Sequence, residues 1–178
     1  MKPIASLIFL ATLCLLQHVA LGGQPVGGNV LEQACQFAKN KETCINTLKK
    51  DPNSQGADLT GLALIALRLA AANAAEVESH LRTLLQKNAP MSPEIQQGVS
   101  DCAETYSDAN GQLDDSTAAL SEKNFNDIIT WVKIAVADSE YCQNAVKGQP
   151  TVVADKSKVF LELCDNALSV IKALAPNP

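Results

Sequence analysis

The sequence has few aromatic residues and almost no histidine, and both shortages limit what the protein can be. Of its 178 residues, 4 % are Phe, Trp or Tyr, and only two are His. Sheet proteins draw on aromatic and β-branched side chains, so a chain poor in aromatics and rich in Ala and Leu favours helices. The scarcity of His also leaves little from which to build a His-based catalytic or metal site.

Clusters of basic residues are also missing, since the formal net charge is −5. This charge argues against nucleic acid as a partner, because phosphate binding needs grouped Lys and Arg side chains. The composition is 47 % hydrophobic and 19 % charged, which excludes a disordered tail and suits one compact domain.

No local catalytic signature is present, since the chain contains no CxxC, HExxH or GxSxG motif. Beyond the N-terminal segment the one remaining histidine is His80, which we expect to be a solvent-exposed surface residue. We therefore expect no catalytic residue, no metal ligand and no cofactor.

The N-terminus has the pattern of a secretory signal peptide. Lys2 is followed by an almost wholly apolar stretch over 4–16, and Ala20-Leu21-Gly22 supplies small residues for cleavage near Gly22. The apolar stretch is too short to span a bilayer, so a retained anchor is the weaker alternative. We expect residues 1–22 to be removed, which leaves 13 basic and 19 acidic residues, a net charge of −6, and no membrane partner.

Five cysteines remain after residue 22, and an odd number leaves at least one unpaired within the chain. In an oxidising compartment the other four would form two disulfides, for which three pairings exist. The short spacing favours Cys35 with Cys44, and Cys102 with Cys142 would then join two longer elements. Cys164 lies on an apolar helical face, which predicts a buried free thiol.

Apolar residues at helical spacing, interrupted by prolines, predict the secondary structure. Asp58, Ser92 and Asn124 are candidate N-caps of the longer segments. The expected helices span 29–38, 42–50, 58–87, 92–120, 125–147 and 151–174.

Four long amphipathic helices with short connections predict an all-α fold, an up-and-down four-helix bundle with an N-terminal helical hairpin extension. We expect a single domain over 23–178, with the hairpin in 23–50 and the bundle in 51–178.

One face of the expected helix 92–120 is acidic. Glu104, Asp108 and Asp115 recur at helical spacing, so they share one side. Such a stripe is either an ordinary solvated face or a docking surface for a basic partner, whose charge would speed the encounter.

The chain resembles the plant family of pectin methylesterase inhibitors and invertase inhibitors. The matching features are Cys35-x8-Cys44, the segment Leu48-Lys49-Lys50-Asp51-Pro52-Asn53-Ser54, and Cys102-Ala103-Glu104-x-Tyr106. The position of Cys142 and the segment 163–168 also match, so the resemblance covers nearly all of the chain after the signal.

The resemblance implies a secreted protein of the extracellular space or cell wall that is not an enzyme but inhibits one. It implies a one-to-one complex that covers the active-site cleft of pectin methylesterase or, alternatively, of acid invertase. Family members pair the first cysteine with the second and the third with the fourth, leaving the fifth free. A secreted helical signalling or storage protein is the alternative of another class.

The resemblance also suggests contact residues. Glu104 and Asp108 match acidic positions of the family, Asn144 occupies a position that is acidic in some members, and Tyr141 is a further candidate contact beside Cys142. Invertase inhibitors typically carry Pro-Lys-Phe where this chain keeps only Phe125, which favours pectin methylesterase as the target.

Overall fold

The computed structural model describes residues 26–87 and 90–175, so the expected signal peptide lies outside the described residues. The helices are α2 (Val26–Ala34), α3 (Lys41–Lys50), α4 (Leu59–Gln86), α5 (Pro93–Glu122), α6 (Phe125–Ala145) and α7 (Ala154–Leu174). Two short 3-10 turns, η1 (Pro52–Ser54) and η2 (Pro150–Val152), precede α4 and α7.

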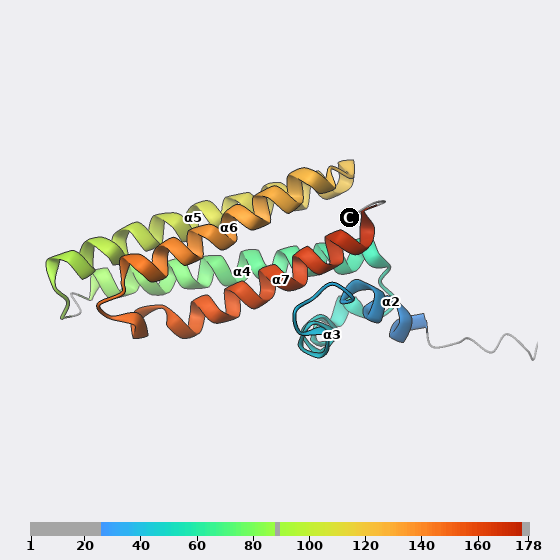
Figure 1. Ribbon diagram of the computed structural model, residues 1–178, viewed down its shortest axis with the longest axis horizontal. Helices are drawn as coiled ribbons and strands as arrows, with labels where there is room; N and C mark the ends of the chain where they lie inside the picture. The colour runs from blue at the N-terminus through green and yellow to red at the C-terminus, as the bar shows by residue number, and fades with distance from the viewer. Residues whose placement is uncertain (1–25, 88–89, 176–178) are drawn as a thin grey trace, which may run out of the picture.

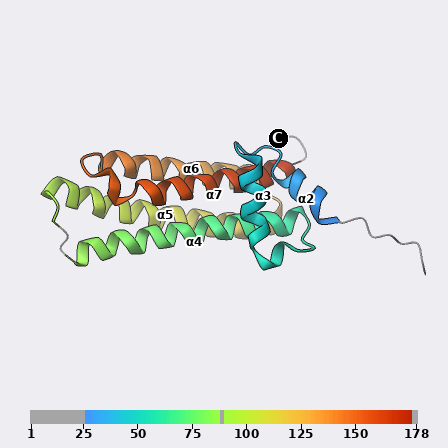
Figure 2. The ribbon, with the colours of Figure 1, turned by 90° about the horizontal axis from the view of Figure 1, so that it is seen from below.

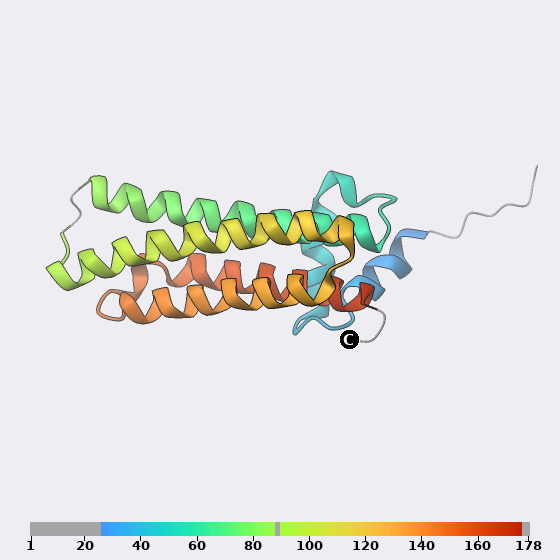
Figure 3. The ribbon, with the colours of Figure 1, turned by 90° about the horizontal axis from the view of Figure 1, so that it is seen from above.

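The four long helices form an up-and-down bundle, which confirms the predicted fold class (Figure 1). Helix α5 packs between α4 and α6, and α7 closes the bundle by packing between α6 and α4. Each of the four long helices therefore has two neighbours within the bundle, and α5 and α7 lie diagonally opposite one another. Figure 3 views the bundle from above, along the side where α5 runs between α4 and α6.

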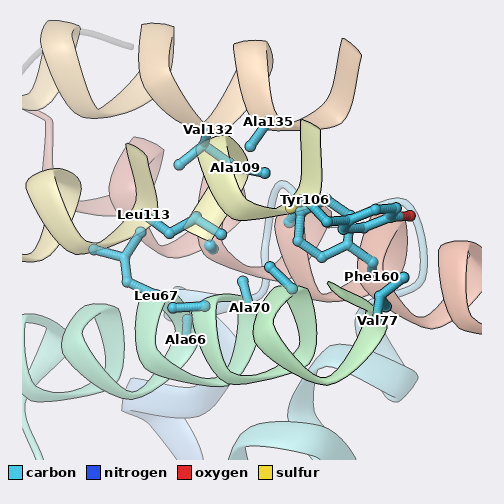
Figure 4. Close-up of a cluster of buried hydrophobic side chains, with 14 of the residues drawn as sticks. Ala66, Leu67, Ala70, Val77, Tyr106, Ala109, Leu113, Val132, Ala135 and Phe160 are labelled. Atoms are coloured by element: carbon cyan, nitrogen blue, oxygen red, sulfur yellow. The ribbon is translucent and has the colours of Figure 1, made fainter. Parts of the chain in front are cut away.

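The bundle core is built from the apolar stripes that the sequence places at helical spacing. Leu67, Leu113 and Val132 come from three different helices and are fully buried together (Figure 4). The aromatic part of the core is Tyr106 against Phe160, whose ring centroids lie 5.3 Å apart in an edge-to-face arrangement. Small alanines on α4, α5 and α6 let the helices approach closely between these larger side chains.

Two of the three predicted N-caps form their side-chain hydrogen bonds. Asp58 Oδ1 accepts from the Gly61 backbone N–H at 2.8 Å, and Ser92 Oγ accepts from the Ile95 N–H at 3.3 Å. Asn124 occupies the N-cap position of α6 as predicted, but the expected side-chain cap is absent, because this side chain donates instead to Glu122 Oε2 at 2.9 Å. This difference arises where α5 ends in a tight turn, with Lys123 in the left-handed conformation at a φ of 60°.

Three local predictions need correction. The first helix spans Val26–Ala34 rather than 29–38, because a turn that includes the Cys35 disulfide follows directly after Ala34. The last helix begins at Ala154 rather than at Thr151, since Pro150–Val152 forms η2. His80 is half-buried rather than fully solvated, and its Nε2 lies 3.2 Å from the Val152 carbonyl oxygen at that turn.

The N-terminal hairpin of α2 and α3 packs across the α4–α7 side of the bundle (Figure 2). The Cys35–Cys44 disulfide joins its two arms. Buried Ser169 of α7 donates to the Ala34 carbonyl at 2.8 Å and accepts from the Phe37 N–H at 3.1 Å. Asp165 Oδ2 accepts from the Lys39 N–H at 2.8 Å, so α7 holds the turn between the two short helices.

Helix α4 is long and apolar enough, by length and composition alone, to cross a membrane. Half of its apolar stretch is buried inside the bundle, where Leu62, Leu67 and Leu81 contribute to the core. Packing within the bundle therefore accounts for its composition.

Candidate docking surface on α5 and α6

Helix α5 carries seven acidic residues and no basic residue. Its net charge is therefore −7, whereas the whole chain after residue 22, α5 included, has a net charge of −6. None of these acidic side chains is among the buried residues of α5, so the surface of this helix carries only negative charge. Such a surface attracts a partner with basic groups over several ångströms of water, and more strongly at low salt.

The register between α5 and α6 is fixed by two pairs of residues. The disulfide between Cys102 and Cys142 joins the helices with a Cα–Cα distance of 4.7 Å. One turn further along, the Tyr106 hydroxyl lies 2.8 Å from Ser139 Oγ. Because the helices are antiparallel, Glu104 is level with Tyr141.

The structure brings the four candidate contact residues onto these two neighbouring helices. Glu104 and Asp108 are exposed on α5, and Tyr141 is 54 % exposed on α6. Asn144 is exposed one turn further on, where its Nδ2 donates to the Glu140 carbonyl at 3.1 Å. An acidic row on one helix thus runs beside polar and aromatic side chains on the next.

Ile134 is a surface residue that the sequence reading did not single out. It is 42 % exposed on α6, and Tyr141 follows it by seven residues, so the two share one side of the helix. The sequence does indicate this exposed pair. Residues 134 and 141 are seven positions apart, like pairs of buried residues on α6, yet they lie outside the buried stripe of that helix. Exposed large apolar side chains of this kind supply much of the binding energy at protein interfaces.

Asp138 lies between these two side chains in sequence and has a perturbed pKa. Partial burial raises the pKa of this carboxyl, the negative charge of Asp108 on α5 raises it further, and the Gln112 side chain acts in the opposite direction. One oxygen of the carboxyl is buried without a hydrogen-bond partner among the described residues. Protonation of Asp138 at acid pH would therefore remove a repulsion between α5 and α6.

Helices α5 and α6 also lie close together near Gly98. A Cβ atom at this position would lie 2.5 Å from the Ala145 carbonyl oxygen, so only glycine fits without a backbone shift. Gly111 differs, since a Cβ there would meet no atom within 4 Å. Gly98 allows α5 and α6 to pack closely. Gly111 leaves no side chain projecting from the acidic surface at its position.

Two further reactive groups, Cys164 and Tyr106, are buried in the core. Burial raises the pKa of the Cys164 thiol well above its usual range, so this unpaired cysteine is a neutral apolar side chain. Burial also raises the pKa of Tyr106, whose hydroxyl lies 2.9 Å from Ser157 Oγ as well as contacting Ser139. Both disulfides and the free thiol match the arrangement that the family resemblance implies.

The fold and this surface together define a disulfide-bonded helical bundle with a candidate docking face. Comparison with known proteins gives the family. The model of the plant invertase/pectin methylesterase inhibitor family matches residues 29–170. The chain belongs to this family, which consists of inhibitors of enzymes rather than enzymes.

The relatives include proteins named for both targets. The chain is 25 % identical over 171 residues to a putative invertase inhibitor of Platanus acerifolia, covering 94 % of each chain. It is 25 % identical over 151 residues to a pectinesterase inhibitor of Actinidia deliciosa, covering 83 % of this chain and 80 % of the relative. A crystal structure of a mutant pectin methylesterase inhibitor from Arabidopsis superposes with a TM-score of 0.70, at 21 % identity, over 83 % of this chain and 98 % of that one.

Proposed function

We propose that this protein inhibits pectin methylesterase by binding the enzyme one-to-one, with the α5–α6 side of the bundle covering the active-site cleft. The observation that carries this proposal is the placement of the hairpin. The hairpin packs on α4 and α7, which leaves the acidic and aromatic side formed by α5 and α6 uncovered. Glu104, Asp108, Tyr141 and Asn144 are the proposed contacts, and Ile134 joins them.

The choice of pectin methylesterase rests on the start of α6. Invertase inhibitors of the family typically present Pro-Lys-Phe at this point, whereas here Asn124 precedes Phe125. Phe125 is itself partly buried against the core and so is only partly available to a partner. The start of α6 therefore lacks the Pro and Lys of the motif and exposes only part of its Phe, which gives an invertase fewer groups to contact.

Acid invertase is the second candidate target. It is favoured by the relatives named as putative invertase inhibitors, which match as much of the chain as those named for pectinesterase. Both targets would use the same uncovered side of the bundle.

The proposed site of action is the extracellular space or cell wall. Support comes from the expected signal peptide over 1–22 and from the two disulfides, which persist in oxidising compartments. We propose that the chain from 23 to 178 acts as one inhibitor domain after the signal is removed.

Parallel enzyme assays distinguish the targets. The purified protein is added to a plant pectin methylesterase, followed by methanol release at acidic and neutral pH, and to an acid invertase, followed by sucrose hydrolysis. We expect loss of methanol release and unchanged sucrose hydrolysis. Inhibition of the invertase alone would replace the first target with the second, and no inhibition of either enzyme would refute the proposed function.

A further inference from the structure

A pocket on the hairpin side of the molecule has the size of a small-molecule site. It lies between α2, α3 and the segment 51–56 that leads to α4, where the hairpin crosses the bundle (Figure 2). Its volume is about 580 Å³, within the range of roughly 300–1,000 Å³ that is usual for ligand pockets. The pocket therefore has room for an organic molecule with a fused-ring or chain-like body.

The walls of this pocket are largely apolar. Leu31 of α2 and Ile45 of α3 line it from the two arms of the hairpin, and Pro52 lines it from η1. Leu31 and Ile45 are only partly buried against the hydrophobic core, so part of each side chain remains in contact with water. A ligand with an apolar body would remove this remaining area from water, and this removal favours binding.

The walls are held in place by the fold itself. The Cys35–Cys44 disulfide joins α2 to α3. In the segment before α4, the Asn53 backbone N–H and the Asn53 side-chain amide both donate to Asp51 Oδ1, at 2.8 Å and 2.9 Å. Because the pocket is already formed, a ligand loses little affinity to the ordering of the protein.

One charged side chain of the lining has no counterpart. Glu32 forms an ion pair with Lys41. The Asp51 carboxylate is already engaged by the two bonds from Asn53. Lys49, by contrast, forms no ion pair in the part of the chain that the structure describes. The charge that the pocket leaves available to a ligand is therefore positive.

We propose that this pocket binds a small apolar carboxylic acid, with the apolar body against Leu31, Ile45 and Pro52 and the carboxylate at Lys49. Both parts of the ligand are needed. A small polar acid would gain nothing from the apolar walls, and an uncharged apolar molecule would leave Lys49 without a partner.

The proposed site and the proposed docking surface are separate. The hairpin packs on α4 and α7, so the pocket remains open when a partner covers the α5–α6 side. Binding of the acid is therefore independent of which enzyme the protein inhibits.

Titration with 1-naphthaleneacetate, followed by methyl chemical shifts in two-dimensional ¹H–¹³C NMR spectra, tests the site. We expect saturable shifts of the Leu31 and Ile45 methyl groups. 1-Naphthaleneacetamide has the same rings without the charge, and acetate has the charge without the rings, so each should bind at least about tenfold more weakly. Absence of saturable shifts at these two residues, or equal affinity for either control compound, would overturn the proposal.

Two neighbouring lysines in the last turn of α3 supply matched variants. Lys49→Gln should weaken 1-naphthaleneacetate binding about tenfold, because it removes one charge-assisted hydrogen bond. Lys50→Gln removes the same charge at an exposed position outside the pocket lining, and should change the affinity less than about twofold. Equal effects of the two substitutions would show that the carboxylate does not bind at Lys49, and thermal melts of both variants check that the fold is intact.

Discussion

Tyr106 is the core residue that links three helices of the bundle through its side chain. Its hydroxyl joins α5 to Ser139 of α6 and Ser157 of α7, and its ring packs edge-to-face on Phe160. All three hydroxyls are buried and satisfy one another, which fixes the relative positions of three helices at one level of the bundle.

Tyr106→Phe keeps the ring and removes the hydroxyl. Two buried serines then lose a partner, which should lower the free energy of unfolding by about 1–2 kcal/mol. For a domain of this size the melting temperature should fall by roughly 2–8 °C in a calorimetric scan. Tyr141→Phe is the control, since that hydroxyl is on the surface and its loss should leave the melting temperature unchanged. Equal melting temperatures for the two variants would contradict the role given to Tyr106.

Asp138 makes stability depend on pH. A carboxyl whose pKa is raised by folding binds its proton more readily in the folded state, so its contribution to stability falls as pH rises from about 3.8 towards neutrality. Asp138→Asn should therefore raise the melting temperature by about 1–2 °C at pH 7, as removal of a like-charge pair does, and by less at pH 4.

Asp114→Asn is the matched control for this prediction. Asp114 is exposed on the same helix as Asp108, and its replacement should shift the melting temperature by a similar amount at both pH values. A difference between pH 4 and pH 7 that is the same for both variants would show that Asp138 is not responsible.

At the scale of the elements, the two glycines of α5 have opposite roles. Gly98→Ala should destabilise the protein by about 1–3 kcal/mol, because the new Cβ would overlap the Ala145 carbonyl and push α6 away. Gly111→Ala should stabilise it by up to about 1 kcal/mol, since the site is open and alanine is the better helix former. Denaturant unfolding measures both changes, and the same sign for both substitutions would contradict this assignment.

The long helices could be predicted from the sequence because their signals are local. Asp58 and Ser92 precede runs of apolar residues at helical spacing, and those runs are the buried faces in the structure. The error at Asn124 arose because Asn124 is a good capping residue in isolation, whereas here the chain leaves α5 through Lys123 in a left-handed turn.

The arrangement of the hairpin could not be predicted, because it depends on contacts between distant segments. Ser169 and Asp165 hold the 34–39 turn from more than 120 residues away, and nothing in their local sequence indicates this. For the same reason the sequence placed Glu104 and Asp108 on one face without showing that the hairpin leaves that side uncovered. His80 likewise gained its partner at η2 only through the fold.

At the scale of the whole molecule, charge is distributed unevenly. Helix α5 has a net charge of −7, while the chain after residue 22 has −6, so everything outside α5 is close to neutral. Helix α5, which carries this charge, lies on the side of the bundle away from the hairpin (Figure 1). Such an asymmetric molecule presents its α5–α6 side to a basic surface during encounter.

Reversing two of these charges should slow association with the target enzyme. The double variant Glu104→Lys, Asp108→Lys should lower the association rate constant by about tenfold at low ionic strength, and by less at high salt. The variant Glu42→Lys, Asp155→Lys changes the net charge equally on α3 and α7, and should have a much smaller effect. Stopped-flow association at two salt concentrations measures both, and equal rate constants would contradict docking through α5.

We propose that one molecule of this protein blocks one molecule of pectin methylesterase. The most direct measurement is a titration of a fixed enzyme concentration, well above the dissociation constant, with methanol release as the readout. Activity should fall linearly and reach its minimum at equal molar amounts of the two proteins. Methanol release that is unchanged at a several-fold molar excess, at both acidic and neutral pH, would contradict the claim.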